Sequence, residues 1–199
     1  MRKQKNKERP TPEYPSLEQM EDEIARLKYR KKYSSLLRGT IYSLAVVAAV
    51  AILVATLWMP MLQITGASMT PTLEDGQFVM AVKTNAFQPG DITAFYYNNK
   101  ILIKRVIASA GDWVDISEDG TVYVNGVLLE EPYIQEKALG ECNIELPYQV
   151  PDGKVFVMGD DRPVSLDSRT TAVGPVSKEQ VLGKVVFRVW PLNTFGGVR

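Results

Sequence analysis

The apolar positions divide this chain into two parts with different periodicities. Residues 41–59 form a nearly continuous apolar run, and no charged residue occurs from Gly39 to Leu73. A run of this kind approaches the roughly 20 residues that a helix needs to cross a bilayer. We therefore expect one transmembrane helix over residues 39–60. The alternatives are a buried soluble helix and a cleaved secretory peptide; the long preceding segment and the bulky residues near Trp58 oppose the second.

After this run the pattern changes to short, β-branched and aromatic segments separated by turn signals, which is typical of strands. We expect a mostly β domain over residues 61–199, built from antiparallel strands. Residues 113–154 are expected to form a small β-ribbon and loop excursion, of which the Pro- and Gly-containing part, 130–154, packs loosely. The predicted strands are 78–83, 92–97, 101–107, 113–116, 122–124, 155–158 and 181–190, and the predicted reversals are 98–99, 119–120 and 125–126.

The segment before the apolar run is basic and partly helical in pattern. A capping signal at Ser16 and apolar residues at helical spacing predict a short amphipathic helix over 16–28, either solvated or loosely associated with a membrane. Residues 1–15 are expected to be disordered. Residues 1–38 hold 11 Lys and Arg against 6 Asp and Glu. Because basic flanks stay cytoplasmic, we expect a cytoplasmic N-terminus and an extracytoplasmic domain in the cell membrane.

Composition and charge narrow the functional classes. The chain is 45% hydrophobic with a mean hydropathy of −0.10, which fits one anchored domain of ordinary size. The residues after 38 carry 12 Lys and Arg against 17 Asp and Glu, so nucleic-acid binding is not expected. The lone Cys142 cannot form an intramolecular disulfide and is interpreted as a small filler residue. We expect neither a metal nor a cofactor.

The chain contains no histidine, so serine chemistry must recruit another base. Residues 66–73 read GASMTPTL and place Ser68 shortly after the apolar run. Lys104 lies in ILIKRVI, residues 101–107, where apolar neighbours can remove water from its amine. Taken alone, Ser68 could be an exposed loop serine and Lys104 part of an edge-strand charge pair.

A third polar segment, residues 158–169, reads MGDDRPVSLDSR and on its own is typical of a surface turn held by ion pairs. The three segments together, with residues 90–92 and 111–112, resemble the boxes of the type I signal peptidases, specifically the single-span bacterial branch, in the same order. The resemblance covers about residues 36–192. It implies an antiparallel β-sheet protease domain of the signal peptidase type behind one transmembrane helix.

The resemblance also implies a role for each matching residue. Ser68 would be the nucleophile and Lys104 the general base. Ser165 would orient the lysine through its hydroxyl, and Asp167 with Arg169 would form a supporting ion pair. Lowering the pKa of a lysine from near 10.4 to about 8 requires roughly 3 kcal/mol, which burial can supply.

The same resemblance implies a membrane-anchored serine endopeptidase that removes signal peptides from exported preproteins after an Ala-x-Ala-like site. The Ser68 N–H would be one oxyanion donor, whereas Gly66 stands where some family members have a serine hydroxyl. The expected partners are preprotein signal peptides and the lipid bilayer. An extended substrate would add as a strand beside the nucleophile. The candidate pocket walls, or alternatively plain core residues, are Ile64, Met69, Leu73, Leu102 and Ile103.

Two other functions are compatible with parts of this pattern. A Ser-Lys self-cleaving repressor shares the nucleophile and base, but it should carry a DNA-binding head, and this chain has an apolar span there. A catalytically inactive, membrane-anchored β-domain could serve as a receptor or assembly factor for secreted proteins. The presence of both Ser68 and Lys104 argues against that second alternative.

Overall fold

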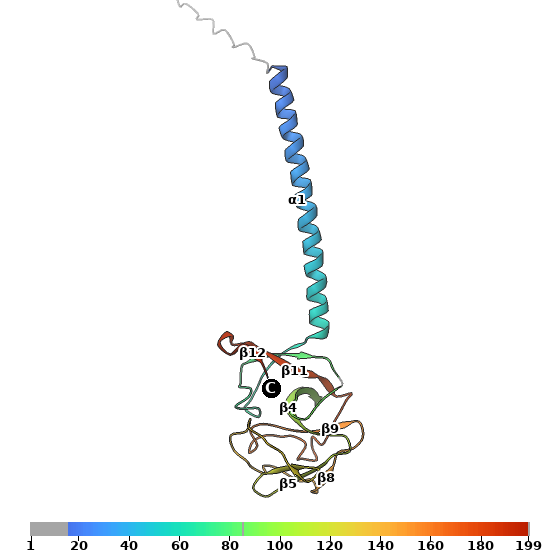
Figure 1. Ribbon diagram of the computed structural model, residues 1–199, viewed down its shortest axis with the longest axis vertical. Helices are drawn as coiled ribbons and strands as arrows, with labels where there is room; N and C mark the ends of the chain where they lie inside the picture. The colour runs from blue at the N-terminus through green and yellow to red at the C-terminus, as the bar shows by residue number, and fades with distance from the viewer. Residues whose placement is uncertain (1–15, 85, 199) are drawn as a thin grey trace, which may run out of the picture. The chain divides into compact units, whose positions relative to one another are not determined.

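The computed structural model describes residues 16–84 and 86–198 (Figure 1). It consists of one long helix followed by a β-rich domain, which confirms the predicted mostly β fold with one N-terminal apolar helix. The disorder expected for residues 1–15 concerns residues outside the described ranges.

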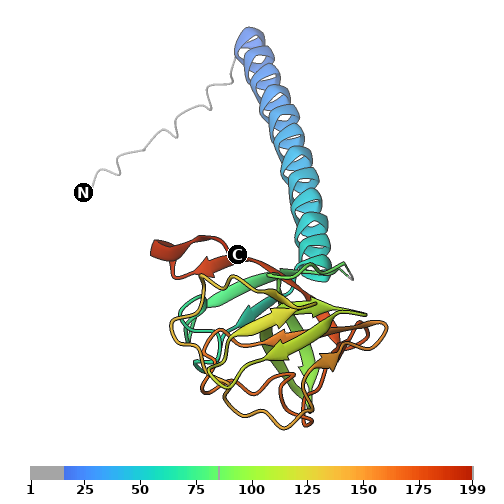
Figure 2. The same cartoon turned by 60° about the horizontal axis from the view of Figure 1, so that its bottom comes forward.

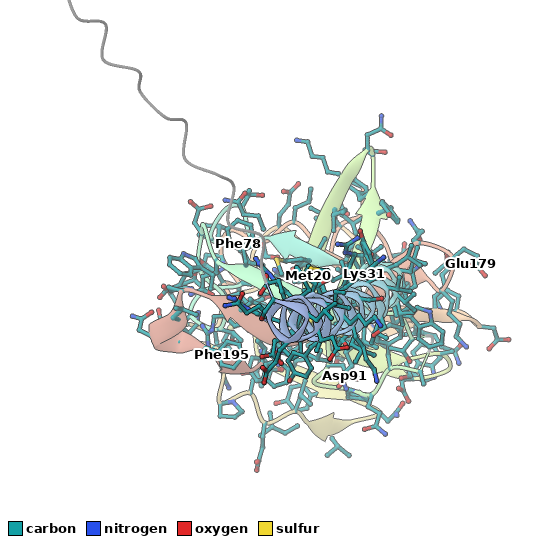
Figure 3. The ribbon with its side chains drawn as sticks, turned by 90° about the horizontal axis from the view of Figure 1, so that it is seen from above. Met20, Lys31, Phe78, Asp91, Glu179 and Phe195 are labelled. Carbon is teal, nitrogen blue, oxygen red and sulfur yellow. The ribbon has the colours of Figure 1, made fainter. Side chains whose placement is uncertain are left out.

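Helix α1 runs without a break over Leu17–Trp58, a length of 42 residues. Its start is a capping box, because the Gln19 N–H donates to Ser16 Oγ at 3.3 Å and the Ser16 N–H donates to Gln19 Oε1 at 3.0 Å. The predicted short helix and the predicted span are therefore one element. No residue of α1 is buried, and Figure 3 shows its side chains, including Met20 and Lys31, leaving the axis in all directions.

The helix is long and apolar enough to cross a membrane, with an 18-residue window of mean hydropathy 2.4. At 1.5 Å per residue its 42 residues extend about 63 Å, roughly twice the hydrocarbon thickness of a bilayer. Only its apolar second half matches the predicted span. The polar first half is thus a helical extension and not a separate amphipathic element.

The β-rich domain contains all seven predicted strands, with small changes at their ends. The additional strands are two or three residues long, too short to give a periodic signal. The strands are β1 (Met61–Gln63), β2 (Phe78–Val82), β3 (Ile92–Tyr97), β4 (Lys100–Ser109), β5 (Trp113–Ile116), β6 (Val122–Val124), β7 (Val127–Leu128), β8 (Tyr148–Gln149), β9 (Lys154–Met158), β10 (Val176–Ser177), β11 (Val181–Trp190) and β12 (Gly196–Gly197), with a 3-10 turn, η1 (Leu192–Thr194), before β12.

These strands form two antiparallel sheets. The larger sheet has the order β1-β2-β11-β3-β4-β9-β10, with β12 added to β11, and the smaller has the order β7-β6-β5-β8. Figure 1 shows β5 and β8 at the opposite end of the domain from β11 and β12, and Figure 2 shows the same domain turned toward the smaller sheet. The expected excursion at residues 113–154 thus contains a four-stranded sheet, whose buried side chains share a core with β4 and β9.

Tight turns set the register of the hairpins. Asn98 and Asn99 adopt positive φ values of 44° and 61° between β3 and β4, which the two-residue hairpin turn requires. Asn125 does the same, at 54°, between β6 and β7. Both reversals were predicted. The first of them pairs Thr93 of β3 with Lys104 of β4.

The core is divided into three clusters of buried side chains. One lies beneath β2 and the segment after β1 and includes Ile64, Met69 and Leu73. A second joins β4 and β9 to the smaller sheet, and a third lies between β3, β4, β9 and β10. Strand β4 thus contributes to the second and third clusters, and partly buried Ile103 packs against the first. This central position makes β4 a rigid support for the side chains that it carries.

Candidate active site

Ser68 and Lys104 meet in the β-rich domain. Lys104 projects from the middle of β4, and Ser68 lies in the turn segment that follows β1. Their side chains are joined by a hydrogen bond of 2.7 Å between Lys104 Nζ and Ser68 Oγ. The structure thus brings together two residues that are 36 positions apart in the sequence.

The environment of Lys104 favours its neutral form. Its side chain is only 2% exposed, and no described carboxylate lies within ion-pair distance of its amine. Burial lowers the pKa of Lys104 to about 8, because an ammonium loses its hydration inside the domain. Asp167, Asp160 and Asp161 act at longer range to raise this pKa, and Arg169 lowers it. The neutral amine is therefore the main form above about pH 8, and roughly a tenth of the amine is neutral at pH 7.

A groove of about 560 Å³ opens directly beside Ser68. Its two long walls are the segment after β1 and the first half of β4. The residues that line it are Gln63, Ile64, Thr65, Gly66, Ser68, Met69, Asn99, Lys100, Ile101, Leu102 and Ile103.

The β4 wall of the groove presents a free strand edge. Among the described residues β4 pairs with β9 only from Arg105 onward, so the β4 residues before Arg105 have one unpaired edge. An extended peptide can add to such an edge by main-chain hydrogen bonds. The groove is therefore shaped for a peptide strand that ends at Ser68.

Four of the five predicted wall residues line this groove, namely Ile64, Met69, Leu102 and Ile103. Ile64 and Met69 also belong to the core beneath it, so the two alternative interpretations of these positions coincide. Leu73 differs: it is fully buried in the same cluster and does not line the groove. It packs under the nucleophile segment because its N–H is bonded to the Met69 carbonyl, at 2.8 Å, in a turn that points its side chain inward.

The backbone around the nucleophile leaves one amide free. No hydrogen bond links the Ser68 N–H to an acceptor in residues 16–84 and 86–198. The Gly66 N–H, in contrast, donates to Asp75 Oδ1 at 2.8 Å, and Gly66 has the positive φ of 87° that favours glycine. Ser68 can thus supply an oxyanion donor, whereas the amide of Gly66 is already used to hold the groove wall.

The predicted supporting pair is present and fully buried. Asp167 Oδ1 accepts from Arg169 Nε at 2.9 Å, and both side chains have no exposed surface. The second oxygen of Asp167 accepts from the Gly159 N–H at 2.9 Å. The pair therefore closes the loop at residues 159–169 onto itself, as expected for structural support.

Ser165 is also buried, but the predicted hydrogen bond to Lys104 is not formed. The Ser165 hydroxyl has no hydrogen-bond partner among the described residues. The Ser165 hydroxyl oxygen lies so close to Gly159 that a Cβ at position 159 would clash with it. The same Cβ would also clash with the Ser68 carbonyl oxygen. Gly159 is needed here because any larger residue would separate Ser165 from the nucleophile segment. Ser165 thus lies beside the hydrogen-bonded pair of Ser68 and Lys104, called the dyad below, on the side of the loop at residues 159–169, and it forms no hydrogen bond to either residue.

Sequence reasoning missed several charged residues behind the dyad. Arg105 donates to Asp160 through Nε at 2.9 Å and Nη2 at 2.7 Å, and Thr72 Oγ1 donates to the same carboxylate at 2.5 Å. Arg162 forms an ion pair with Glu131. The sequence did contain one signal for Arg105, because it lies in an apolar run, and a charge that is buried with such a run needs a buried partner. Nothing in the sequence indicated which carboxylate would meet which arginine.

Part of the segment 130–154, which was predicted to pack loosely, makes fixed contacts with buried arginines. The Leu139 carbonyl accepts from Arg169 Nη1 at 2.6 Å, and Glu131 is held by Arg162. The expectation of loose packing rested on proline and glycine content, which reports local flexibility of the chain and not its tertiary contacts. This part of the excursion is therefore attached to the loop behind the dyad.

A serine bonded to a desolvated amine, beside a groove for an extended peptide, is the arrangement expected of a serine hydrolase. Comparison with known proteins agrees: the family described as signal peptidase, peptidase S26, matches residues 37–190. The chain belongs to this family, as the resemblance predicted. Because it is a family of serine peptidases, the chain is a hydrolase.

Individual relatives extend over most of the chain. Signal peptidase IB of Staphylococcus aureus is 36% identical over 176 residues, which cover 78% of this chain and 90% of that relative. The chloroplastic thylakoidal processing peptidase 1 of Arabidopsis thaliana is 39% identical over 145 residues, 64% of this chain and 41% of that relative. A crystal structure of a signal peptidase I from Enterococcus faecalis V583 is 34% identical and covers 50% of this chain and 96% of that one, with a TM-score of 0.41.

Proposed function

We propose that this chain is a membrane-anchored serine endopeptidase that removes signal peptides from exported preproteins, with Ser68 as nucleophile and Lys104 as general base. The observation that carries the proposal is the 2.7 Å hydrogen bond between Ser68 Oγ and a lysine amine whose pKa is lowered to about 8. Membership of the signal peptidase family supports the choice of substrate.

The mechanism needs a single base for both half-reactions. Neutral Lys104 accepts the Ser68 proton while Oγ attacks the scissile carbonyl carbon, and the resulting ammonium delivers that proton to the leaving amine of the mature chain. Lys104 then removes a proton from the water that attacks the acyl-enzyme, and the ammonium returns this proton to Ser68 Oγ as the ester bond breaks and the signal peptide leaves with a free carboxylate. The free Ser68 N–H donates to the oxyanion in both steps. Asp167 and Arg169 support the loop behind the dyad and take no part in proton transfer.

The groove supports the cleavage preference. A substrate strand between the segment after β1 and the first half of β4 would place alternate side chains toward Ile64, Met69, Leu102 and Ile103. Because Ile64 and Met69 are also core residues that cannot move aside, the space above them suits small side chains. An Ala-x-Ala sequence before the scissile bond satisfies this requirement.

The test is cleavage of a purified preprotein with Ala at positions −3 and −1 by the full-length enzyme in detergent micelles. We expect Ser68→Ala and Lys104→Ala each to lower kcat by a factor of about 10⁴ or more, because each removes a partner of the proton transfer. The matched controls are Ser117→Ala and Lys178→Ala, at exposed positions away from the groove, which should retain wild-type activity. Normal processing by Lys104→Ala would refute the assignment of the base.

The proposed arrangement in the cell is a cytoplasmic N-terminus, a transmembrane segment within residues 39–60, and a catalytic domain over residues 61–199 outside the membrane. The excess of Lys and Arg before the apolar run supports this orientation. Because Cys142 is the only cysteine of the chain, labelling of its thiol shows on which side of the membrane the catalytic domain lies.

A membrane-impermeant maleimide should therefore label the protein in sealed right-side-out vesicles and not in inverted ones. The Cys142→Ser variant is the control and should remain unlabelled in both. Labelling restricted to inverted vesicles would reverse the proposed orientation while leaving the peptidase assignment intact.

A further inference from the structure

Three arginine side chains lie fully or almost fully buried behind the dyad. Arg162 and Arg169 have no exposed surface, and Arg105 is 2% exposed. A guanidinium does not lose its proton at any ordinary pH, so each of these charges needs acceptors inside the domain. The positions of those acceptors determine what the arginines hold in place.

The arginines hold the segment 159–161, which touches the nucleophile. Arg162 Nε donates to the Gly159 carbonyl at 3.1 Å, and Arg105 holds the carboxylate of Asp160 by two hydrogen bonds. The next amide, that of Asp161, donates to the Ser68 carbonyl at 3.2 Å. Each residue of this segment thus has a fixed partner, and the last one fixes the backbone of Ser68.

A stretch of the excursion, residues 131–139, covers the arginines from the other side; we call it the strap. Glu131 accepts from both terminal nitrogens of Arg162, one of these hydrogen bonds being 3.0 Å. The ring of Tyr133 lies over the Arg105 guanidinium, with 3.9 Å from Cζ to the ring centroid. The Leu139 carbonyl binds Arg169. The strap therefore contacts all three buried cations.

Glu131 and Tyr133 are themselves joined, because the Tyr133 hydroxyl donates to Glu131 Oε1 at 3.0 Å. Burial raises the pKa of Tyr133, and the neighbouring Glu131 carboxylate raises it further. The phenol thus stays protonated and remains a donor over the whole working range of pH. The two side chains act as one unit that spans Arg105 and Arg162.

We propose that Glu131 and Tyr133 are positioning residues of the peptidase, which hold the segment 159–161 and so the Ser68 backbone against Lys104 through Arg162 and Arg105. This inference rests on the proposed function. Neither residue lines the groove beside Ser68, so their effect should reach the reaction only through the geometry of the dyad. A misplacement of about 1 Å at a reacting group costs on the order of 100-fold in rate.

The test compares kcat and KM of full-length variants on the same preprotein, with kcat divided by the folded fraction measured from an unfolding curve at the assay temperature. Tyr133→Leu removes the ring over Arg105 and should lower kcat about 10-fold with KM unchanged. Tyr133→Phe keeps the ring over Arg105 but loses the hydrogen bond to Glu131, so it should lower kcat less than Tyr133→Leu does. Glu131→Asp withdraws the carboxylate by one methylene and should lower kcat by a factor of about 10 to 100.

Glu130→Gln is the matched control, because this neighbouring carboxylate is exposed and forms no ion pair with a described residue. A wild-type kcat per folded molecule in Glu131→Asp and Tyr133→Leu, with only a lower stability, would overturn the proposal. A change in KM with kcat preserved would also overturn it, since it would place the strap in substrate binding. If Tyr133→Leu fails to fold, Glu131→Asp decides alone.

The failure of this inference is distinguishable from that of the proposed function. If the wild type does not cleave the preprotein, the proposed function fails and the variants carry no information about the strap. If the wild type cleaves it and the strap variants match the wild type, only the positioning role is lost.

Discussion

Lys104 and Arg105 are consecutive residues of β4, equally buried at 2% exposure, and the protein treats their charges in opposite ways. Lys104 meets a hydroxyl and has no carboxylate within ion-pair distance among the described residues. Arg105 is bonded to Asp160, Thr72 and the Gly90 carbonyl, and lies against the ring of Tyr133.

The difference follows from the chemistry of the two side chains. An ammonium that is buried without compensation can release its proton, whereas a guanidinium cannot and must be paired. The same burial therefore favours the neutral form of Lys104 and requires that the charge of Arg105 be paired. If the carboxylate that pairs with Arg105 stood beside Lys104 instead, it would raise the pKa of the lysine and leave the guanidinium unpaired. The neutral amine and the paired arginine would then be lost together.

Asp160→Asn removes the carboxylate that pairs with Arg105 and should have the largest effect on stability. It leaves Arg105 buried with a neutral partner, and the expected loss in the free energy of unfolding is about 3–5 kcal/mol. Urea unfolding in detergent measures it, with the exposed Asp152→Asn as control. A loss below about 1 kcal/mol would show that Arg105 finds other compensation, for instance from water.

Lys104→Met removes the buried amine that has no ion-pair partner among the described residues, and we expect it to stabilise the domain. Folding lowers the pKa of Lys104 from 10.5 to about 8, so the unfolded chain binds more protons between these values. The resulting penalty is complete below pH 8 and disappears as the pH rises from 8 to 10.5. Removal of the amine should thus raise the free energy of unfolding at pH 7 by about 3 kcal/mol.

The methionine keeps the apolar stem of the side chain, so packing should change little. The gain should shrink toward pH 10.5, and this pH dependence separates it from a packing effect. A variant that is less stable than the wild type at pH 7 would contradict the uncompensated charge. Activity should be absent throughout.

The pH–rate profile tests the charge of Lys104 in the wild type, and a neighbouring substitution should change this profile by the smallest of the expected effects. Because the neutral amine is the active form, kcat/KM should rise about tenfold per pH unit below pH 8 and level off above it. Asp161 raises the pKa of Lys104, so Asp161→Asn should shift the profile toward lower pH and increase the rate at pH 7 about twofold. Asp152→Asn should leave the profile unchanged; a flat wild-type profile would refute the base.

The fold was largely predictable because its signals are local. The apolar run, the alternation along the strands and the Asn98-Asn99 reversal each depend on neighbours in the sequence, and the corresponding elements are present. The short strands β1, β7, β8, β10 and β12 were not predicted, because two or three residues carry no period. The loose packing expected for residues 130–154 did not anticipate the contacts of residues 131–139 with the buried arginines, because these partners are distant in the sequence.

The candidate site was predictable in part for a different reason. The absence of histidine made Lys104 the candidate base for Ser68, and the resemblance supplied Ser165, Asp167 and Arg169 as candidate supporting residues. The buried pair of Asp167 and Arg169 followed from two residues close in sequence. The bond from Ser165 to Lys104 did not form, because Ser165 packs against the backbone at Gly159.

The sequence by itself determined that this chain has a long apolar helix, a β-rich domain and no histidine to serve a serine, because these properties depend on residue type and local order. Only the tertiary structure decided that Arg105 would have a carboxylate partner while Lys104 would have none within ion-pair distance in the described part of the chain, and that Glu131 and Tyr133 would contact the arginines. Charge compensation depends on which side chains meet in space, and the residues that meet here, 28 to 55 positions apart in the sequence, become partners only after the sheets have folded.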